Sequence, residues 1–337
     1  MSGDSGRGSV WVVGAGSIGC YVGGCLQALG TTVHFVGRPR VLDVLRLHGL
    51  TVSDLDGGHA HIAPAQLSLF TELPAGPAPS LVLLCVKSGA TQQAAADMAL
   101  WLPAATPVLS LQNGIGNVAL AQAHAPQLHV LPGMVPFNVA ELADGCFHRG
   151  TSGELAAQDD AALRPWQAQF RAAGLGLQLH ADLRALQWGK LLVNLNNPVN
   201  ALSGLPLRAQ LLDRDLRRSV AALQDEALAV LDAAGIEVAR VTPLPAHRVP
   251  GVLRLPNWAF RLVAARMLRI DDKARSSMAD DLALGRTTEI DALCGEVVRL
   301  AASVNMSAPR NATMVRLLSA RHPSPMSGRV LRRELGA

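Results

Sequence analysis

The pattern of hydrophobic and polar residues changes character about halfway along this 337-residue chain. In the first half, short apolar runs rich in β-branched residues alternate with amphipathic stretches, which is typical of buried parallel strands separated by helices. We assign strands to 10–13, 32–36, 81–86 and 107–109, and helices to 18–29 and 90–101. Gly57-Gly58 is a two-residue hairpin signal between 51–56 and 59–63, so we expect a small antiparallel element inserted into the sheet.

After about residue 180 the alternation stops and helical periodicity takes over. The expected helices are 183–201, 212–234, 258–268, 277–284 and 288–304, with a proline-rich connector from Pro243 to Pro256. A parallel sheet with helices on both faces, followed by helices alone, indicates two domains. We therefore predict an α/β fold, with an N-terminal Rossmann dinucleotide-binding domain at 9–180 and an all-α domain at 181–337.

A glycine-rich turn joins the first predicted strand to the first predicted helix. Gly14, Gly16 and Gly19 have G-x-G-x-x-G spacing. The first glycine permits a tight turn, the second lets the backbone approach a pyrophosphate, and the third lets the helix pack closely on the strand. Because a helix N-terminus favours anions, we expect Gly14, Gly16, Ser17, Ile18 and Gly19 to bind the phosphates of a dinucleotide. The alternative is a turn that only packs a helix on a sheet.

The end of the second predicted strand carries a cation where an NAD site usually has an acid. The sequence there is Val36-Gly37-Arg38-Pro39-Arg40, with no Asp or Glu. The planar, permanently charged guanidinium of Arg38 suits a 2′-phosphate, so the sequence favours NADP(H) as the cofactor. A solvated surface charge is the other interpretation of Arg38.

Polar residues also follow the next two predicted strands. Lys87 comes after 81–86, and Asn113 comes shortly after 107–109. Ligands of open α/β sheets bind beyond the carboxyl ends of the strands. We therefore expect Lys87 and Asn113 to join Gly14 and Arg38 at the cofactor-binding edge of the sheet.

Composition narrows the class of protein further. The chain is 49% hydrophobic and 17% charged, with a net charge of +4, and its basic tail has no interleaved aromatic residues, so we expect no nucleic-acid partner. The five cysteines lack C-x-x-C spacing, which predicts reduced core residues and no metal site. No run of eighteen apolar residues occurs, so we expect no membrane partner and a cytoplasmic protein.

The helical half contains one polar stripe on an otherwise apolar segment. Lys190, Asn194 and Asn197 lie on one face of the predicted helix 183–201. Such a stripe must face water, a polar network or a ligand, and we favour a ligand over a buried lysine with asparagine partners. Hydride transfer from NADP(H) to a carbonyl group would need a proton donor for the developing oxyanion. Lys190 is the best candidate for that role, because no histidine of this half lies in a recognisable motif.

Taken together, these motifs resemble the ketopantoate reductase (2-dehydropantoate 2-reductase) family. The matching pieces, in the family's order, are the 14–19 turn (G-A-G-S-I-G), Cys85-Val86-Lys87, the segment 111–117 (L-Q-N-G-I-G-N), Lys190 with Asn194, and Ser276-Ser277-Met278 followed by Thr288-Glu289-Ile290-Asp291. They extend from about residue 10 to 320. The resemblance implies a Rossmann domain joined to a helical domain like that of 6-phosphogluconate dehydrogenase. It also implies NADPH-dependent reduction of a 2-oxo acid to a 2-hydroxy acid in pantothenate biosynthesis.

The resemblance implies roles for individual residues as well. Lys190 corresponds to the family's catalytic lysine, and Glu289 corresponds to its substrate-side carboxylate. Ser277 is expected to bind the substrate carboxylate, while Asn113 and Asn194 orient the substrate. For Glu289, a helix acid in the first turn, favoured by the dipole, is the alternative.

The chain departs from the family in two segments. Asn197-Pro198 comes one residue early, after an extra Asn196, and Asn200 is unusual; the segment 132–138 also lacks the typical Thr/Gly-rich stretch. We expect both changes to lie near the substrate. Two alternatives therefore stay open: a related NADP-dependent reductase of another branched 2-oxo acid, and a non-catalytic NADP-binding sensor. The sequence also leaves open whether the chain acts as a homodimer.

Overall fold

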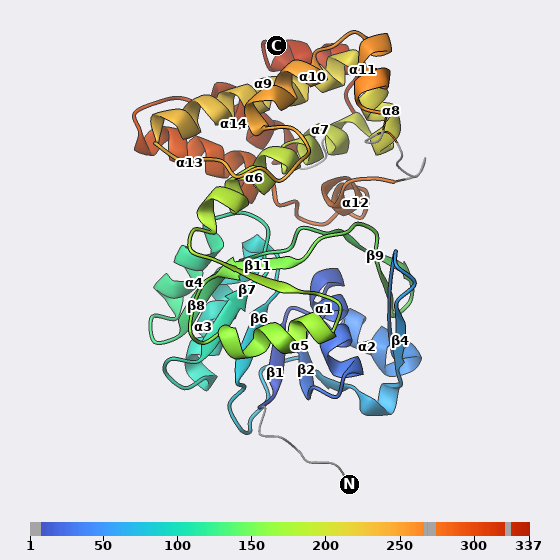
Figure 1. The fold of residues 1–337 in the computed structure, drawn as a ribbon, viewed down its shortest axis with the longest axis vertical. Helices are drawn as coiled ribbons and strands as arrows, with labels where there is room; N and C mark the ends of the chain where they lie inside the picture. Colours follow the sequence, from blue (N-terminus) through green and yellow to red (C-terminus); the bar gives the residue numbers. More distant parts are fainter. Residues whose placement is uncertain (1–7, 266–267, 269–273, 321–324) are drawn as a thin grey trace. The chain divides into compact units, whose positions relative to one another are not determined.

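The computed structural model describes residues 8–265, 268, 274–320 and 325–337, which form two compact units. The first unit runs to Leu183 and the second begins at Arg184 (Figure 1). The first unit is built on a mainly parallel sheet and the second is helical, as the sequence predicts.

The first unit contains an eight-stranded sheet. Its order is β12 (Leu177–His180), β11 (Leu155–Gln158), β8 (His129–Met134), β7 (Pro107–Ser110), β6 (Leu81–Leu84), β1 (Val10–Val13), β2 (Val33–Val36) and β5 (Ser68–Phe70). The six strands from β8 to β5 are parallel to one another, and β11 is antiparallel to β8. In chain order these six strands read 3-2-1-4-5-6 across the sheet, the order of a dinucleotide-binding Rossmann domain. The order reverses between β1 and β6.

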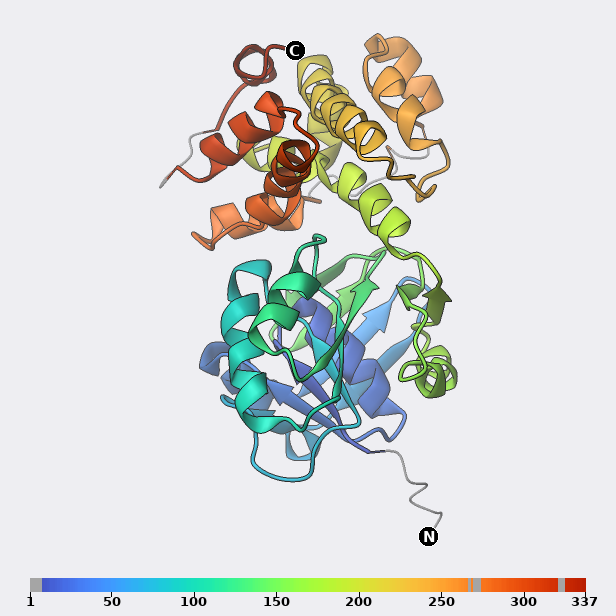
Figure 2. The same cartoon turned by 90° about the vertical axis from the view of Figure 1, so that its left-hand side faces the viewer.

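Both faces of this sheet are covered, which explains why its strands are apolar without alternation. Val10 and Val12 of β1 pack in the core that includes α1 (Ser17–Ala28), whereas Trp11 and Val13 pack in the core that includes α3 (Thr91–Trp101) and α4 (Asn117–His124). Figure 2 looks onto α3 and α4, which cover one face of the sheet, and α1 lies on the other face in both views.

The Gly57-Gly58 hairpin forms as predicted, but its place in the fold differs from our expectation. β3 (Leu50–Asp54) and β4 (His59–Ile62) belong to a separate sheet of order β4-β3-β10-β9, with β10 at Cys146–Arg149 and β9 at Val139–Ala143. The hairpin therefore does not enter the main sheet. It pairs instead with a strand about ninety residues further along the chain, Cys146 lying opposite Thr51.

Helix α1 packs between these two sheets, and its glycines permit the close approach. A Cβ atom at Gly23 would lie 2.6 Å from the ring of Phe35 in the main sheet, and one at Gly24 would lie 2.7 Å from Val52 in the second sheet. The helix that begins at the glycine turn is therefore held on two sides, which fixes the position of its N-terminus.

The helical unit is arranged around one long helix. The helices are α6 (Arg184–Asn194), α7 (Asn196–Ser203), α8 (Leu207–Leu212), α9 (Arg214–Ala233), α10 (Val249–Leu253), α11 (Asn257–Val263), α12 (Ser277–Ala283), α13 (Glu296–Ser303), α14 (Pro309–Leu318) and α15 (Gly328–Glu334). The central helix α9 contacts α7, α8, α10, α13, α14 and α15.

Four predicted segments of this unit differ in the structure. The single helix expected at 183–201 is two helices, because Pro198 has no amide hydrogen for the carbonyl of Asn194 and the helix is interrupted at Leu195. The connector from Pro243 to Pro256 contains α10, which carries Pro250 in its first turn, where proline is tolerated. The helix expected at 288–304 begins as a π-helical turn at Asp291–Gly295 and continues as α13. The helix expected at 258–268 is shorter, because α11 ends at Val263; residues 266 and 267 lie outside the described residues.

Candidate functional site

The glycine turn has the geometry that its spacing predicts. Gly14 has a φ of 109°, and a Cβ atom there would lie 2.5 Å from the amide nitrogen of Val86. A Cβ atom at Gly19 would lie 2.3 Å from the carbonyl oxygen of Gly14. Both positions therefore require glycine, one for the tight turn beside β6 and the other for close packing of α1 on that turn.

Gly16 differs because the space beside it is open. A Cβ atom at Gly16 would have no described atom within 4 Å. Among the residues that the structure describes, no side chain caps α1 at Gly16, and its first turn carries no acid. The amide groups of Ser17, Ile18 and Gly19, which a helix cannot satisfy itself, are therefore suited to an anion such as a pyrophosphate.

Arg38 lies at the end of the neighbouring strand. The carbonyl oxygen of Val36, the last residue of β2, accepts hydrogen bonds from the amides of Gly14 (2.9 Å) and Ala15 (3.0 Å). Arg38 follows two residues later, as the exposed residue that precedes α2 (Pro39–His48). The glycine turn and the predicted 2′-phosphate ligand are thus tied to each other through the backbone of two adjacent strands.

Lys87 and Asn113 occupy the corresponding positions on the other side of β1. The amide of Cys85 donates to the carbonyl of Val13 (2.8 Å), and the amide of Leu111 donates to the carbonyl of Leu84 (2.9 Å). These bonds join the ends of β1, β6 and β7, so the structure brings the exposed Lys87 and the half-buried Asn113 to the same sheet edge as Gly14.

In the helical unit, Lys190 and Asn194 lie one turn apart on α6, and both are half-buried. Asn197 lies beyond the interruption at Leu195, on α7, so the stripe of three residues is shared between two helices. Burial lowers the pKa of the Lys190 ammonium group from 10.5 to about 8, and the carboxylate of Glu289 opposes this shift by favouring the charged form.

Glu289 precedes the π-helical turn instead of standing within it. The acid in the first turn is Asp291, and Glu289 is half-buried. The alternative explanation of Glu289 as a first-turn helix acid therefore does not fit. Its charge acts on Lys190, a residue about one hundred positions earlier in the chain.

Ser277 and Asn197 belong to adjoining elements. The hydroxyl of Ser276 accepts from the amide of Ala279 (3.2 Å), which caps α12, and donates to the carbonyl of Asn197 (3.4 Å). Ser277 is the exposed first residue of α12. The two serines therefore have different positions. Ser276 anchors α12 to α7, and Ser277 is exposed at the surface of the unit.

The unusual asparagines Asn196 and Asn200 form hydrogen bonds within the helical unit, and the expectation that they lie near the substrate stays a prediction. Asn200 is fully buried, and its side chain accepts from the amide of Ser276 (3.0 Å) and donates to the carbonyl of Leu205 (2.9 Å). The side-chain oxygen of Asn196 accepts from Gln210 (2.8 Å). In the segment 132–138, most side chains are likewise buried, including Val135 and Phe137 in the core of the first unit.

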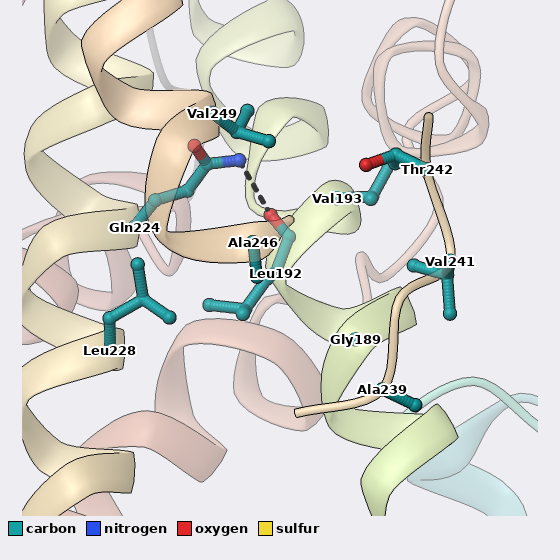
Figure 3. Close-up of a pocket in the computed structure, with 10 residues that line it drawn as sticks. All are labelled: Gly189, Leu192, Val193, Gln224, Leu228, Ala239, Val241, Thr242, Ala246 and Val249. Atoms are coloured by element: carbon teal, nitrogen blue, oxygen red, sulfur yellow. Dashed lines mark hydrogen bonds between the residues drawn. The ribbon is translucent and has the colours of Figure 1, made fainter. Parts of the chain in front are cut away.

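A small apolar cavity lies beside α6, and Figure 3 shows its lining residues. Gly189, Leu192 and Val193 line it from α6, and Gln224 of α9 donates to the carbonyl of Leu192 (3.0 Å). Its volume is about 20 Å³, which suits roughly one water molecule. Neither Lys190 nor Asn194 is among its lining residues, so this cavity belongs to the packing of α6 and not to a substrate site.

Other site types receive little support. The five cysteines are free thiols; Cys20 and Cys294 are buried, as expected of core residues, whereas Cys25, Cys85 and Cys146 are half-buried. Over residues 8–265, 268, 274–320 and 325–337, no group of three or more His, Cys, Asp and Glu side chains could hold a metal ion. None of the helices in this described part is both long and apolar enough to cross a membrane.

The strand order and the glycine turn define a Rossmann-like nucleotide-binding fold followed by a helical unit. Residues 10–161 match the family described as "Ketopantoate reductase PanE/ApbA", and residues 182–322 match "Ketopantoate reductase PanE/ApbA C terminal". A 2-dehydropantoate 2-reductase of Halobacterium salinarum is 31% identical over 320 residues, which cover 92% of this chain and 97% of that protein. The chain belongs to the ketopantoate reductase family of oxidoreductases.

Solved structures show the same architecture. A PanE/ApbA family ketopantoate reductase from Ralstonia eutropha JMP134 superimposes with a TM-score of 0.77 at 26% identity, covering 98% of this chain and 100% of that one. A D-mandelate dehydrogenase solved with NADH and anilino(oxo)acetate gives a TM-score of 0.76 at 20% identity, covering 93% and 98%. The second likeness concerns the fold alone.

Proposed function

We propose that this chain catalyses the NADPH-dependent reduction of 2-dehydropantoate (ketopantoate) to pantoate, a step of pantothenate biosynthesis. The main support is that residues 10–161 and 182–322 match the two parts of one reductase family in the expected order. Relatives named 2-dehydropantoate 2-reductase also align with more than nine-tenths of the chain, at 31% and 27% identity.

The first unit is assigned to the cofactor. The open space beside Gly16 and the uncapped start of α1 fit a pyrophosphate, held by Gly14, Gly16, Ser17, Ile18 and Gly19.

Charged and polar groups at the neighbouring strand ends complete this half of the site. Arg38 is assigned to the 2′-phosphate because its guanidinium forms paired, charge-assisted hydrogen bonds with phosphate oxygens. Lys87 and Asn113 are assigned to the cofactor at the ends of β6 and β7. When bound, NADPH supplies the hydride that the carbonyl carbon receives.

Lys190 is assigned as the general acid. Negative charge develops on the carbonyl oxygen as the carbon is reduced, and the Lys190 ammonium donates a proton to that oxygen. A pKa of about 8 lies close to neutral pH, which lets the lysine be charged before the reaction and release its proton during it. The Glu289 carboxylate favours the charged form of Lys190, so that the ammonium group is present to donate its proton.

The substrate side is assigned to Asn113, Asn194, Asn197 and Ser277. The hydroxyl of Ser277 suits a carboxylate oxygen, and the asparagine amides suit the carbonyl, carboxylate and hydroxyl groups of a 2-oxo acid. The unusual residues Asn196 and Asn200 bond within the helical unit itself, so they give no support to a different substrate.

The test is loss of NADPH absorbance with ketopantoate and with a panel of other 2-oxo acids, each at equal concentration. We expect the highest kcat/KM with ketopantoate. A higher kcat/KM with another branched 2-oxo acid would overturn the substrate, and no turnover with any 2-oxo acid alongside tight NADPH binding would favour the sensor.

A further inference from the structure

A chain of polar side chains, all buried except the half-buried Ser88, lies behind the sheet edge that carries Lys87 and Asn113. It consists of Ser110, Gln112, Thr91, Asn117 and Ser88, which we call the loop-linking network. The hydroxyl of Ser110 donates to the side-chain oxygen of Gln112 (3.0 Å), and the Gln112 amide donates to the hydroxyl of Thr91 (2.7 Å). Thr91 then donates to the side-chain oxygen of Asn117 (3.0 Å), whose amide donates to Ser88 (3.1 Å).

The network joins the first residues of two helices. Thr91 begins α3 and Asn117 begins α4, and these helices pack against each other. Their N-terminal ends follow β6 and β7, the strands that are followed by Lys87 and Asn113. One set of hydrogen bonds therefore spans both strand-to-helix loops.

The network ends on the backbone of the two loops. The Gln112 amide also donates to the carbonyl oxygen of Val86 (2.9 Å), the residue directly before Lys87. The carbonyl oxygen of Asn113 accepts from the Asn117 amide (2.6 Å) and from the hydroxyl of Ser88 (3.2 Å). One loop is therefore held at Val86, directly before Lys87, and the other is held at Asn113 itself. Both Lys87 and Asn113 are predicted ligand-binding residues.

Every polar side-chain atom of Thr91, Gln112 and Asn117 is used in these bonds, and the three residues are 0%, 7% and 6% exposed. None of these atoms is among the buried unpartnered atoms of the described residues. A buried network in which every group is satisfied holds its members in one arrangement, because any movement leaves a desolvated group without a partner.

We propose that Thr91, Gln112 and Asn117 are positioning residues that set the Lys87 and Asn113 loops in the geometry needed for cofactor and substrate. The proposal rests on the function proposed above, in which Lys87 and Asn113 contact these ligands. The three residues act through the loop backbones and touch neither ligand.

Thr106 offers a control that distinguishes a positioning role of Thr91 from a contribution to stability alone. Thr106 directly precedes β7, at the opposite end of the strand from Gln112, and it too is buried, at 6% exposed. Its hydroxyl donates to the carbonyl of Pro103 (2.7 Å). Replacement of Thr91 or Thr106 by valine removes the same hydroxyl at nearly the same volume, but only Thr91 links the two loops.

The experiment compares Thr91→Val, Thr91→Ser and Thr106→Val in the full-length protein. NADPH affinity is measured by fluorescence titration, ketopantoate KM and kcat by NADPH oxidation, and stability by urea unfolding. We expect Thr91→Val to raise both the NADPH Kd and the ketopantoate KM by roughly three- to tenfold, because the two hydrogen bonds of the Thr91 hydroxyl are lost and part of that loss reaches the loops. Thr91→Ser keeps the hydroxyl and should restore both constants, and Thr106→Val should leave both within about twofold of wild type.

Unchanged Kd and KM in Thr91→Val, with only a loss of stability like that of Thr106→Val, would overturn the positioning role. If Thr91→Val does not fold, Ser88→Ala removes the outer link to Asn113 at a half-buried site, and unchanged constants there would overturn it equally. If wild type binds NADPH but does not reduce ketopantoate, the proposed substrate is wrong. The NADPH titration of Thr91→Val then still tests whether the network positions the Lys87 loop.

Discussion

Replacement of Glu289 by glutamine should move the alkaline limit of catalysis to lower pH. Burial lowers the pKa of Lys190 to about 8, and the Glu289 carboxylate opposes that shift. The acid form is the ammonium, so the proton donor is present below pH 8 and is lost as the pH rises. Wild-type kcat/KM should therefore be level up to about pH 7 and fall about tenfold per pH unit well above pH 8.

Removing the carboxylate takes away a charge that favours the ammonium, so the pKa of Lys190 should fall further. An opposite charge at close range commonly changes a pKa by about one unit or more. With such a change, about half of the Glu289→Gln molecules would carry the ammonium at pH 7, against about nine-tenths of the wild type. The assay is the pH profile of kcat/KM for ketopantoate, which reports the pKa of the free enzyme.

Glu237→Gln is the matched control, because Glu237 is an exposed glutamate of the same unit and is not among the charges that act on Lys190. It should leave the profile unchanged. An alkaline limit that stays at the same pH in Glu289→Gln, whatever the change in absolute rate, would refute the electrostatic link between Glu289 and the proton donor.

Three further changes test other parts of the account. Arg38→Ala should weaken NADPH binding by roughly tenfold or more and leave NADH nearly unchanged, since it removes charge-assisted bonds to the 2′-phosphate; equal losses for the two cofactors in titrations would contradict this. Ser277→Ala and Asn194→Ala should raise the ketopantoate KM while NADPH affinity stays within about twofold, and a larger defect in NADPH titration would place these residues on the cofactor side. Arg217→Met should lower the free energy of unfolding by roughly 2–5 kcal/mol in urea, because two buried carbonyl groups and one half-buried carbonyl group lose their donor. A loss below about 1 kcal/mol would contradict this.

Arg217 of α9 is buried within the helical unit. Its guanidinium is fully buried and donates to the carbonyls of Leu211, Leu253 and Leu255 at 2.8–3.0 Å. It also lies 4.1 Å from the ring centroid of Phe260. The sequence gives no sign of this role, because Arg217 stands beside Arg214 and Arg218 at the start of a long amphipathic helix, a pattern typical of a solvated face.

The nucleotide-binding half could be predicted because its signals are local. The glycine turn and the apolar runs each specify their own element, and the roles of Gly14 and Gly19 follow from what a Cβ atom would strike. The second sheet could not be predicted because β3 pairs with β10 across more than ninety residues, and nothing within 50–62 shows that partner. Pairing at that distance depends on where α1 packs.

The helical half was harder to predict around Lys190, the proposed general acid. Apolar periodicity continues on both sides of Leu195 and hides the interruption that Pro198 causes, so the sequence predicts one helix where Asn194 and Asn197 lie on two. The charge of Glu289 on Lys190 joins residues about one hundred positions apart, and helical periodicity gives no sign of such a link.

The sequence alone does not indicate the loop-linking network, although Gln112 and Asn117 both stand within the 111–117 segment. Their partner Thr91 lies more than twenty residues earlier, and only the packing of α3 on α4 brings the three together. A glutamine between Leu111 and Asn113 has the same appearance in the sequence whether its side chain contacts a ligand or the protein's own backbone.

The most direct test of the account is the turnover of Lys190→Ala at saturating NADPH and ketopantoate, alongside an NADPH titration of the same variant. We expect kcat to fall by roughly 10²–10⁴-fold, the usual contribution of a general acid. NADPH affinity should remain close to that of wild type, because the residues assigned to the phosphates lie in the other unit. Near-normal turnover in Lys190→Ala would contradict the account and would require another residue to supply the proton.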